Sequence, residues 1–224
     1  MELNEKISVI CAVKNRINML KFSINSWVAY KNIHEFIIVD WSSDDITHDE
    51  EEYFKKLDDR IKIIKVENEK YFNLSKSFNL AAKNASGDLL LKLDVDYILN
   101  PYYDFFETYN INKNEFLTGD WNGYEKNREV GFLLYLNGFL YVHKENFFKV
   151  EGYNENLRGY GYDDCDLYSR LESVAGLKRT YLDCDKIVIY HNPHEDNLRS
   201  KNYECKNIKL THSRNYNFYS NKKL

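Results

Sequence analysis

Proline and glycine are scarce in this sequence, which contains 2 Pro and 9 Gly among its 224 residues. Collagen-like and low-complexity proteins contain far more of both residues, so these classes are excluded. No run of about 18 consecutive apolar residues occurs, so we expect no transmembrane helix. Aromatic residues make up 16% of the chain, and this content excludes an intrinsically disordered protein.

Cysteine is also sparse, and its positions form no recognisable pattern. The 4 cysteines include no CxxC pair, so neither a zinc ribbon nor a thioredoxin-type site is expected. The N-terminal sequence MELNEKISVICAV lacks the basic segment and the apolar stretch of a signal peptide. We therefore expect a cytoplasmic protein, with peripheral attachment to a membrane as a further option.

The charges are nearly balanced, with 31 Lys and Arg against 35 Asp and Glu and a net charge of −4. This balance argues against a protein that binds nucleic acid through bulk positive charge, so no nucleic-acid partner is expected. The length is typical of one globular domain, and no repeat or linker divides residues 1–224.

Apolar runs and amphipathic segments alternate through the first half of the chain, which predicts strands alternating with helices around a mostly parallel sheet. The predicted strands are Ile7–Val13, Phe36–Val39, Ile61–Val66 and Leu89–Leu93. The predicted helices are Asn18–Tyr30, Asp49–Leu57 and Leu74–Asn84. We therefore expect an α/β fold whose central sheet carries helices on both faces.

The second half is less regular, and its predicted elements are of mixed type. Asn137-Gly138 is a hairpin signal between two apolar runs, Phe132–Leu136 and Phe139–His143. Asp163–Val174 is predicted to be a helix, because acidic residues at its start suit the helix dipole. Leu177–Leu182 and Ile187–Tyr190 are predicted strands, and the residues from Asn192 onward are expected to form a polar tail around the domain.

Two aspartates directly follow the fourth predicted strand, in the sequence Leu93-Asp94-Val95-Asp96-Tyr97. Ligands of open parallel sheets bind at the carboxyl ends of the strands. Two neighbouring carboxylates repel each other unless a cation lies close, and Mg²⁺ or Mn²⁺ prefers such oxygen ligands. A metal site is one interpretation, and a solvated acidic turn is the other.

Polar residues also follow the second predicted strand, where Asp40 precedes Ser42, Ser43 and Asp44. Hydroxyl and carboxylate groups at a strand end can bind a nucleoside, but Ser43 or Asp44 can equally cap the next helix.

The segment from Arg158 to Asp166 reads RGYGYDDCD. Its glycines permit close approach of a ligand to the backbone, and Tyr160 and Tyr162 offer flat faces that stack on sugar rings. Asp163 or Asp164 can accept a proton from an attacking hydroxyl, although acids at a helix start also stabilise the helix by themselves. His191 and His194 follow the last predicted strand, and His191 is a candidate third metal ligand.

Taken together, the segments VICAVKNR, IIVDWSSDD, LSKSFNLA, LKLDVDYIL and GYGYDDCDLYSRL resemble, in this order, the GT-A glycosyltransferases of family 2. The later half is also similar to the galactosyltransferase C-terminal region of β-1,4-galactosyltransferases and chondroitin-type polymerases. The resemblance covers roughly Ile7 to His194 and implies a GT-A (Rossmann-like) fold.

The resemblance also implies roles for individual residues. It implies that Asp164 is the general base and that the acceptor is bound by Tyr160, Gly161, Tyr162 and Asp163, with Trp121 as a further wall. Donor binding is implied for Ala12, Val13, Arg16, Asp40, Ser42, Lys76, Asn79 and Asp94. The implied ligands of Mn²⁺ or Mg²⁺ are Asp94, Asp96 and His191, and His194 is able to replace His191.

This sequence departs from the galactosyltransferase pattern at two points. Asp163 stands where that family has Glu, with Cys165 interrupting the acidic run, and Val188 stands where it has a methionine ligand. The departures affect the expected sugar and metal geometry more than the expected reaction.

The implied activity is metal-dependent, inverting transfer of a sugar from a nucleotide-sugar donor to a hydroxyl of a glycan acceptor. The expected donor is a UDP-linked Gal, GalNAc or Glc type. Residues 1–100 form the expected nucleotide-binding half, residues 101–195 the acceptor-binding half and residues 196–224 the tail. A nucleotidyltransferase acting on a sugar phosphate is an alternative, disfavoured because Val13-Lys14-Asn15-Arg16 contains no glycine. A non-catalytic sugar-binding homologue is the second alternative.

Overall fold

The computed structural model describes residues 5–120, 136–183, 186, 188–192, 194 and 201–204. Within these residues a seven-stranded sheet has the strand order β3-β2-β1-β4-β7-β6-β8. The strands of the sheet are β1 (Ile7–Val13), β2 (Ile33–Trp41), β3 (Ile61–Val66), β4 (Leu89–Lys92), β6 (Glu115–Thr118), β7 (Leu140–His143) and β8 (Lys178–Tyr181). A second, two-stranded sheet pairs β5 (Tyr97–Leu99) with β9 (Ile189–His191).

The large sheet is mostly parallel, as the alternation of strands and helices predicts. Strand β1 pairs in parallel with both β2 and β4, and β2 pairs in parallel with β3. Strand β7 is antiparallel to β4 and to β6, and β6 is parallel to β8. The chain passes from β1 to β2 and β3 on one side and returns to β4 on the other, so the strand order reverses between β1 and β4.

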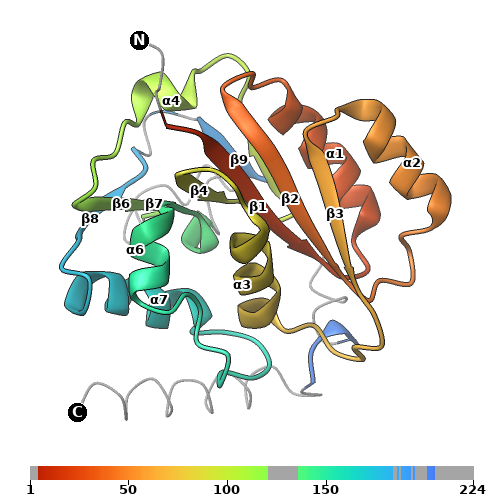
Figure 1. The fold of residues 1–224 in the computed structure, drawn as a ribbon. Helices are drawn as coiled ribbons and strands as arrows, with labels where there is room; N and C mark the ends of the chain where they lie inside the picture. Colours follow the sequence, from red (N-terminus) through yellow and green to blue (C-terminus); the bar gives the residue numbers. More distant parts are fainter. Residues whose placement is uncertain are drawn as a thin grey trace.

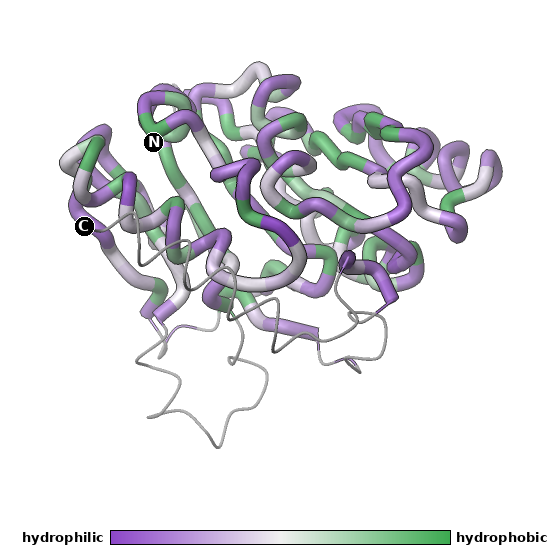
Figure 2. The backbone as a smooth tube through the Cα atoms, turned by 90° about the horizontal axis from the view of Figure 1, so that it is seen from below, coloured by the Kyte–Doolittle hydropathy of each residue, from purple (hydrophilic) through white to green (hydrophobic). Residues whose placement is uncertain are grey.

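Helices cover both faces of the sheet (Figure 1). Helices α1 (Ile17–Val28) and α2 (His48–Leu57) lie over one face. Helices α3 (Leu74–Asn84), α6 (Lys144–Lys149) and α7 (Asp163–Ser173) lie over the other, and the short helix α4 (Phe105–Thr108) follows β5. Along the helical turns in Figure 2, hydrophobic and hydrophilic segments alternate, as expected for helices with one buried and one solvent-facing side.

Each face has its own apolar core, and the alternation along β1 separates the two. Val9 and Cys11 pack with α1 residues such as Trp27, whereas Ile10 packs with Phe78 of α3. Every residue of β1 is buried, which explains why this strand is a continuous apolar run in the sequence.

The predicted fold class is confirmed, and the predicted strands and helices of the first half are present with small changes of boundary. The predicted hairpin around Asn137-Gly138 is wrong. Leu136–Gly138 forms a short 3₁₀ helix, and β7 pairs with β4 and β6. The rest of the first expected hairpin strand, residues 132–135, lies outside the described residues.

Four short elements were not predicted: β5, α4, β6 and α6. Each spans only three to six residues, too short for a periodic pattern. In the described part of the chain, no helix has the length and apolar character needed to cross a membrane.

Candidate active site and metal-binding cluster

A cavity of about 250 Å³ lies at the carboxyl ends of β1 and β4, where the strand order reverses. Ligands of open α/β sheets bind at such points. The cavity is lined by residues from the loops after both strands, from the start of α7 and from the last described segment. They are Ala12, Val13, Lys14, Arg16, Phe72, Leu74, Phe78, Asp94, Val95, Asp96, Tyr97, Asn137, Gly138, Tyr160, Asp164, His191, His194, Asn202 and Tyr203.

Asp96 and two histidines form a cluster with the composition of a metal site. The pairing of β5 with β9 aligns Tyr97 with His191, and so brings the end of β9 next to the residue before β5. The Oδ2 atom of Asp96 lies 2.9 Å from Nε2 of His194 and 3.5 Å from Nε2 of His191. Among the described residues, the ligand atoms of these three side chains lie within 4.8 Å of one another and could hold a metal ion.

The environment of Asp96 favours its ionised form. Burial alone raises the pKa of an aspartate, but hydrogen bonds from His191 and His194 and the charge of Arg16 hold the pKa of Asp96 well below its usual range. Nη1 of Arg16 lies 3.5 Å from Oδ2 of Asp96 and 3.3 Å from Nε2 of His194. A carboxylate that stays ionised at neutral pH is ready to bind a cation.

Asp94, the other aspartate of the pair, has a different partner. Its Oδ1 lies 3.0 Å from Nζ of Lys92, and its side chain is 32% exposed. Gly138 lies against this pair, and a Cβ atom there would come within 2.7 Å of Asp94 Oδ2 and 3.0 Å of Lys92 Nζ. The glycine predicted to form a hairpin turn is therefore needed for the close approach of these charged groups.

Lys92 is completely buried and connects the loop after β4 to α7. Its Nζ donates to the carbonyl oxygen of Gly138 at 2.5 Å and to Oδ1 of Asp164 at 3.3 Å. Burial alone would lower the pKa of Lys92, but the charges of Asp164 and Asp94 outweigh it and raise the pKa above its ordinary value. The lysine is therefore a permanent cation between two carboxylates.

The two acids at the start of α7 point to different surroundings. Asp164 lines the cavity, and its side chain is 18% exposed. Asp163 is buried and accepts a hydrogen bond of 2.8 Å from Ser75 of α3. Burial and the neighbouring charge of Asp164 raise the pKa of Asp163 to about 7, so this residue is not fully ionised at neutral pH.

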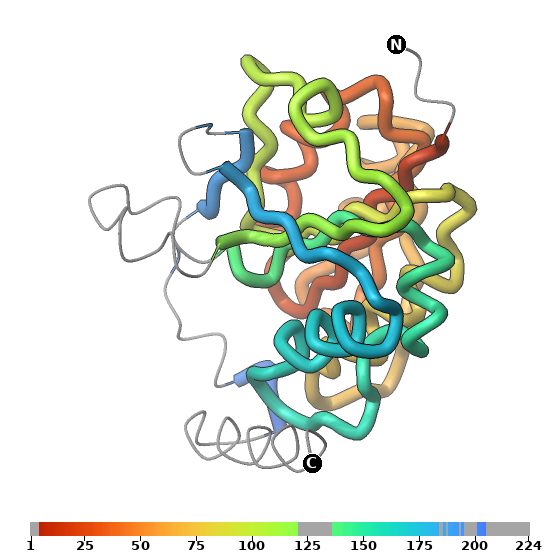
Figure 3. The backbone as a smooth tube through the Cα atoms, turned by 90° about the vertical axis from the view of Figure 1, so that its left-hand side faces the viewer, coloured from red at the N-terminus to blue at the C-terminus, as the bar shows by residue number. Residues whose placement is uncertain are grey.

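Aromatic residues form one wall of the cavity. The Tyr160 and Tyr203 rings meet edge to face at 5.5 Å, and Tyr203 contacts Phe72 in the same way at 5.6 Å. In Figure 3 the short described segment near the C-terminus lies beside the loop that leads into α7. Gly161 and Tyr162 both have positive φ values, 102° and 66°, and neither lines the cavity. Trp121 lies outside the described residues.

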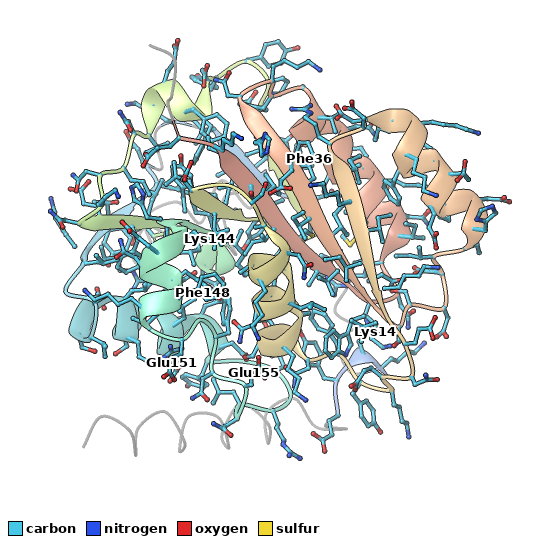
Figure 4. All side chains as sticks on the ribbon, viewed as in Figure 1. Lys14, Phe36, Lys144, Phe148, Glu151 and Glu155 are labelled. Carbon is cyan, nitrogen blue, oxygen red and sulfur yellow. The ribbon has the colours of Figure 1, made fainter. Side chains whose placement is uncertain are left out.

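The end of β1 and the loop after it form another part of the wall, with Ala12, Val13 and Arg16 lining the cavity as the resemblance implies for donor binding. Lys14 also lines it and donates to the carbonyl oxygens of Trp41, Ser42 and Glu69, which ties together the ends of β1, β2 and the loop after β3. Figure 4 shows Lys14 at this end of the strands.

The remaining implied donor-binding residues lie away from the cavity wall. Asp40 is buried and accepts from the backbone N–H of Ser43, and burial raises its pKa. The Ser42 hydroxyl donates to the carbonyl oxygen of Val66. Lys76 is exposed, and Asn79 is buried against Tyr153. Donor binding by these four residues stays a prediction.

Comparison with known proteins identifies the family. Residues 8–163 match the family described as glycosyl transferase family 2. The chain belongs to this family. No curated protein matches the full sequence significantly.

Solved glycosyltransferases share the fold. One is the mannosyltransferase PcManGT from Pyrobaculum calidifontis, in complex with GDP-Man and Mn²⁺, with 11% identity and a TM-score of 0.64 over 81% of this chain and 56% of that one. GalNAc-T7 with UDP, GalNAc and Mn²⁺ has 16% identity and a TM-score of 0.64, over 80% of this chain and 42% of that one. A Drosophila β1,4-galactosyltransferase 7 mutant with manganese, UDP-Gal and xylobiose has 16% identity and a TM-score of 0.61, over 92% of this chain and 79% of that one.

These likenesses establish a GT-A fold for this family 2 glycosyltransferase. The chain spans 56% and 42% of the length of the first two structures, so it matches only part of each.

Sequence analysis missed several residues in and around this cavity. Lys92 carried a signal, because it is a charged residue inside the apolar run LLLKL. Asn202 and Tyr203 carried none, because they lie in a polar segment without periodicity. His194 was named only as a replacement for His191, whereas the structure groups both with Asp96.

Proposed function

We propose that this protein is a metal-dependent, inverting glycosyltransferase that moves a sugar from a nucleotide-sugar donor to a hydroxyl of a glycan acceptor. The observation that carries the proposal is the convergence of Asp96, His191 and His194 with Asp164 on one cavity at the switch point of the sheet. A group of metal-binding side chains and a separate carboxylate that acts as the base are the two parts that such a transfer needs.

The ligand atoms of Asp96, His191 and His194 fit a divalent cation. One carboxylate oxygen and two imidazole nitrogens form a mixed set, which suits Mn²⁺ better than Mg²⁺, because Mg²⁺ prefers oxygen ligands alone. Bound there, such an ion supplies positive charge that neutralises the diphosphate as it leaves. Arg16 adds a second positive charge at the same place, 3.5 Å from Asp96.

The chain's own residues account for the remaining requirements of a single displacement. The Asp164 carboxylate takes the proton of the acceptor hydroxyl while the new bond to the anomeric carbon forms and the bond to the diphosphate oxygen breaks. Tyr160 and Tyr203 supply flat surfaces for sugar rings beside this carboxylate. Attack opposite the leaving group inverts the configuration of the anomeric carbon.

A UDP-sugar of the Gal, GalNAc or Glc type is the proposed donor. Two of the structurally similar glycosyltransferases were solved with UDP or UDP-Gal, and another with GDP-Man. The direct test incubates the purified protein with a panel of nucleotide sugars and Mn²⁺ and measures release of the nucleoside diphosphate. Release with none of the donors, with and without saccharide acceptors, would reject the proposal.

Asp164→Asn tests the base. We expect the transfer rate to fall by about 10²- to 10⁴-fold, because the amide cannot accept the acceptor's proton. Glu172→Gln is the matched control, since Glu172 is an exposed acid on the same helix. Product analysis by NMR of the anomeric proton checks inversion. Transfer by Asp164→Asn near the wild-type rate would remove Asp164 from the mechanism.

A further inference from the structure

A second side chain contacts Asp164 in addition to Lys92. The hydroxyl of Tyr153 donates a hydrogen bond of 2.7 Å to Oδ1 of Asp164. The Nζ of Lys92 lies 3.3 Å from the same oxygen. No described residue donates a hydrogen bond to Oδ2, so one oxygen of the carboxylate is held and the other is left for a ligand in the cavity.

Tyr153 is itself fixed from several sides. Its backbone carbonyl accepts a hydrogen bond from Asn79 Nδ2 at 2.9 Å, and its N–H donates to Asn79 Oδ1 at 2.8 Å. Its ring packs between Phe78 and Phe147, with centroids 5.8 and 6.0 Å away. The ring is 2% exposed, so the hydroxyl has little freedom to turn away from Asp164.

The loop before Tyr153 is built to allow this contact. Gly152 has a φ of 65°, and a Cβ there would come within 2.5 Å of Asn79 Oδ1. Arg170 of α7 donates to the carbonyl oxygen of Gly152 at 2.6 Å and pairs with Asp166 at 2.7 Å. Asn79 also donates to Glu155, which Figure 4 labels below α3. The loop is thus anchored to α3 through Asn79 and to α7 through Arg170.

We propose that Tyr153 is a positioning residue that fixes the orientation of the Asp164 carboxylate. Lys92 is the charged partner of the same carboxylate oxygen, and Asn79 holds the Tyr153 backbone in place. This inference rests on the proposed role of Asp164 as the base. It gives Asn79 a function through Tyr153 in place of direct contact with the donor. It also explains why a fully buried tyrosine and lysine face one partly exposed carboxylate.

The proposal has a measurable consequence in the kinetics. A carboxylate that loses one of its two fixed contacts samples more orientations, so kcat falls while the KM values for donor and acceptor change little.

Tyr153→Phe removes the hydroxyl and keeps the packing. We expect kcat to fall by about 10- to 100-fold, in line with a hydrogen bond to a charged group, with little change in the KM values for donor and acceptor. Tyr168→Phe is the matched control, because the Tyr168 hydroxyl is equally buried but donates to the carbonyl oxygens of Asn137 and Phe139. Thermal unfolding of both variants separates loss of stability from loss of positioning.

The outcomes separate this inference from the proposed function. A wild-type protein without transfer activity rejects the function itself. Transfer activity that is lost in Asp164→Asn but retained in Tyr153→Phe overturns the positioning role alone. Equal losses of kcat in Tyr153→Phe and Tyr168→Phe also overturn it, because the effect would then come from the core. A loss of kcat confined to Tyr153→Phe, with little change in KM, supports the positioning role.

Discussion

Three basic side chains surround one buried carboxylate in the wall of the cavity. Asp96 faces His191, His194 and Arg16 within 3.5 Å, whereas Asp94, two residues earlier, faces Lys92. The two aspartates of one motif therefore have separate partners. Only the second, Asp96, lies in a group of side chains that could hold a metal ion. The sequence alone ranks the two carboxylates equally, because a spacing of two residues contains no information about their partners.

His191 and His194 provide the test of this division. We expect His191→Ala and His194→Ala each to raise the Mn²⁺ concentration for half-maximal activity by about 10-fold or more, because each removes a ligand. The binding of Mn²⁺ measured by calorimetry checks the same change without turnover. His34→Ala, which alters an exposed histidine, is the control. An unchanged Mn²⁺ dependence in either variant would remove that histidine from the site.

Glu35 of β2 stabilises the junction of three strands away from the cavity. Its carboxylate accepts hydrogen bonds from Ser8 of β1, from Ser86 before β4 and from Lys62 of β3, at distances of 2.5–2.8 Å. Burial opposes ionisation, but these donors lower the pKa of Glu35 to about 2. Because the folded pKa lies below the unfolded value of about 4.3, the stabilisation is present above pH 5 and lost as the pH falls toward 2.

Glu35→Gln removes this charge and keeps the shape. We expect the free energy of unfolding at pH 7 to fall by about 2 kcal/mol, allowing for the exposure of Lys62, and the gap to the wild type to narrow as the pH falls from 5 toward 2. Urea unfolding of both proteins at several pH values measures this difference in the free energy of unfolding. Glu52→Gln is the control, because its partner Lys55 is exposed on α2. A gap independent of pH would show that the loss is not electrostatic.

The elements differ in how far the sequence predicts them. Strands β1 to β4 and helices α1 to α3 carry full periodic patterns and short connections, and sequence analysis found all of them. The pairing of β5 with β9 joins segments of three residues each, which no local pattern predicts. That pairing brings His194 to Asp96 over 98 positions of sequence. The cluster therefore depends on long-range packing, and sequence analysis named its residues without establishing their grouping.

At the scale of the whole molecule, the segment at 201–204 forms part of the cavity wall and lies beside the carboxyl ends of β1, β2 and β3 in Figure 1. Asn202 donates to the carbonyl oxygen of Lys14 at 2.8 Å, and its own carbonyl accepts from the N–H of Phe72 at 2.6 Å. Residues expected to be only a tail thus contribute Asn202 and Tyr203 to the cavity wall. The site is built from both ends of the chain.

Asn202→Ala tests whether this part of the wall serves binding. The variant loses the side-chain bond to Lys14 and the longer bond from Asn15 Nδ2 at 3.4 Å but keeps the backbone bond to Phe72, so the segment should stay folded but be held more weakly against the loop after β1. We expect the KM for the donor to rise about 5- to 10-fold, in line with the net loss of about one hydrogen bond, with kcat within about twofold of the wild type. Lys201→Ala, in the same turn but exposed, is the control. The segment contacts the β1 loop, Phe72 and, through Tyr203, Tyr160, and no hydrogen bond among the described residues joins it to Asp164 or Tyr153. A fall in kcat at constant KM would therefore contradict this account and point to a role of the segment in the chemical step.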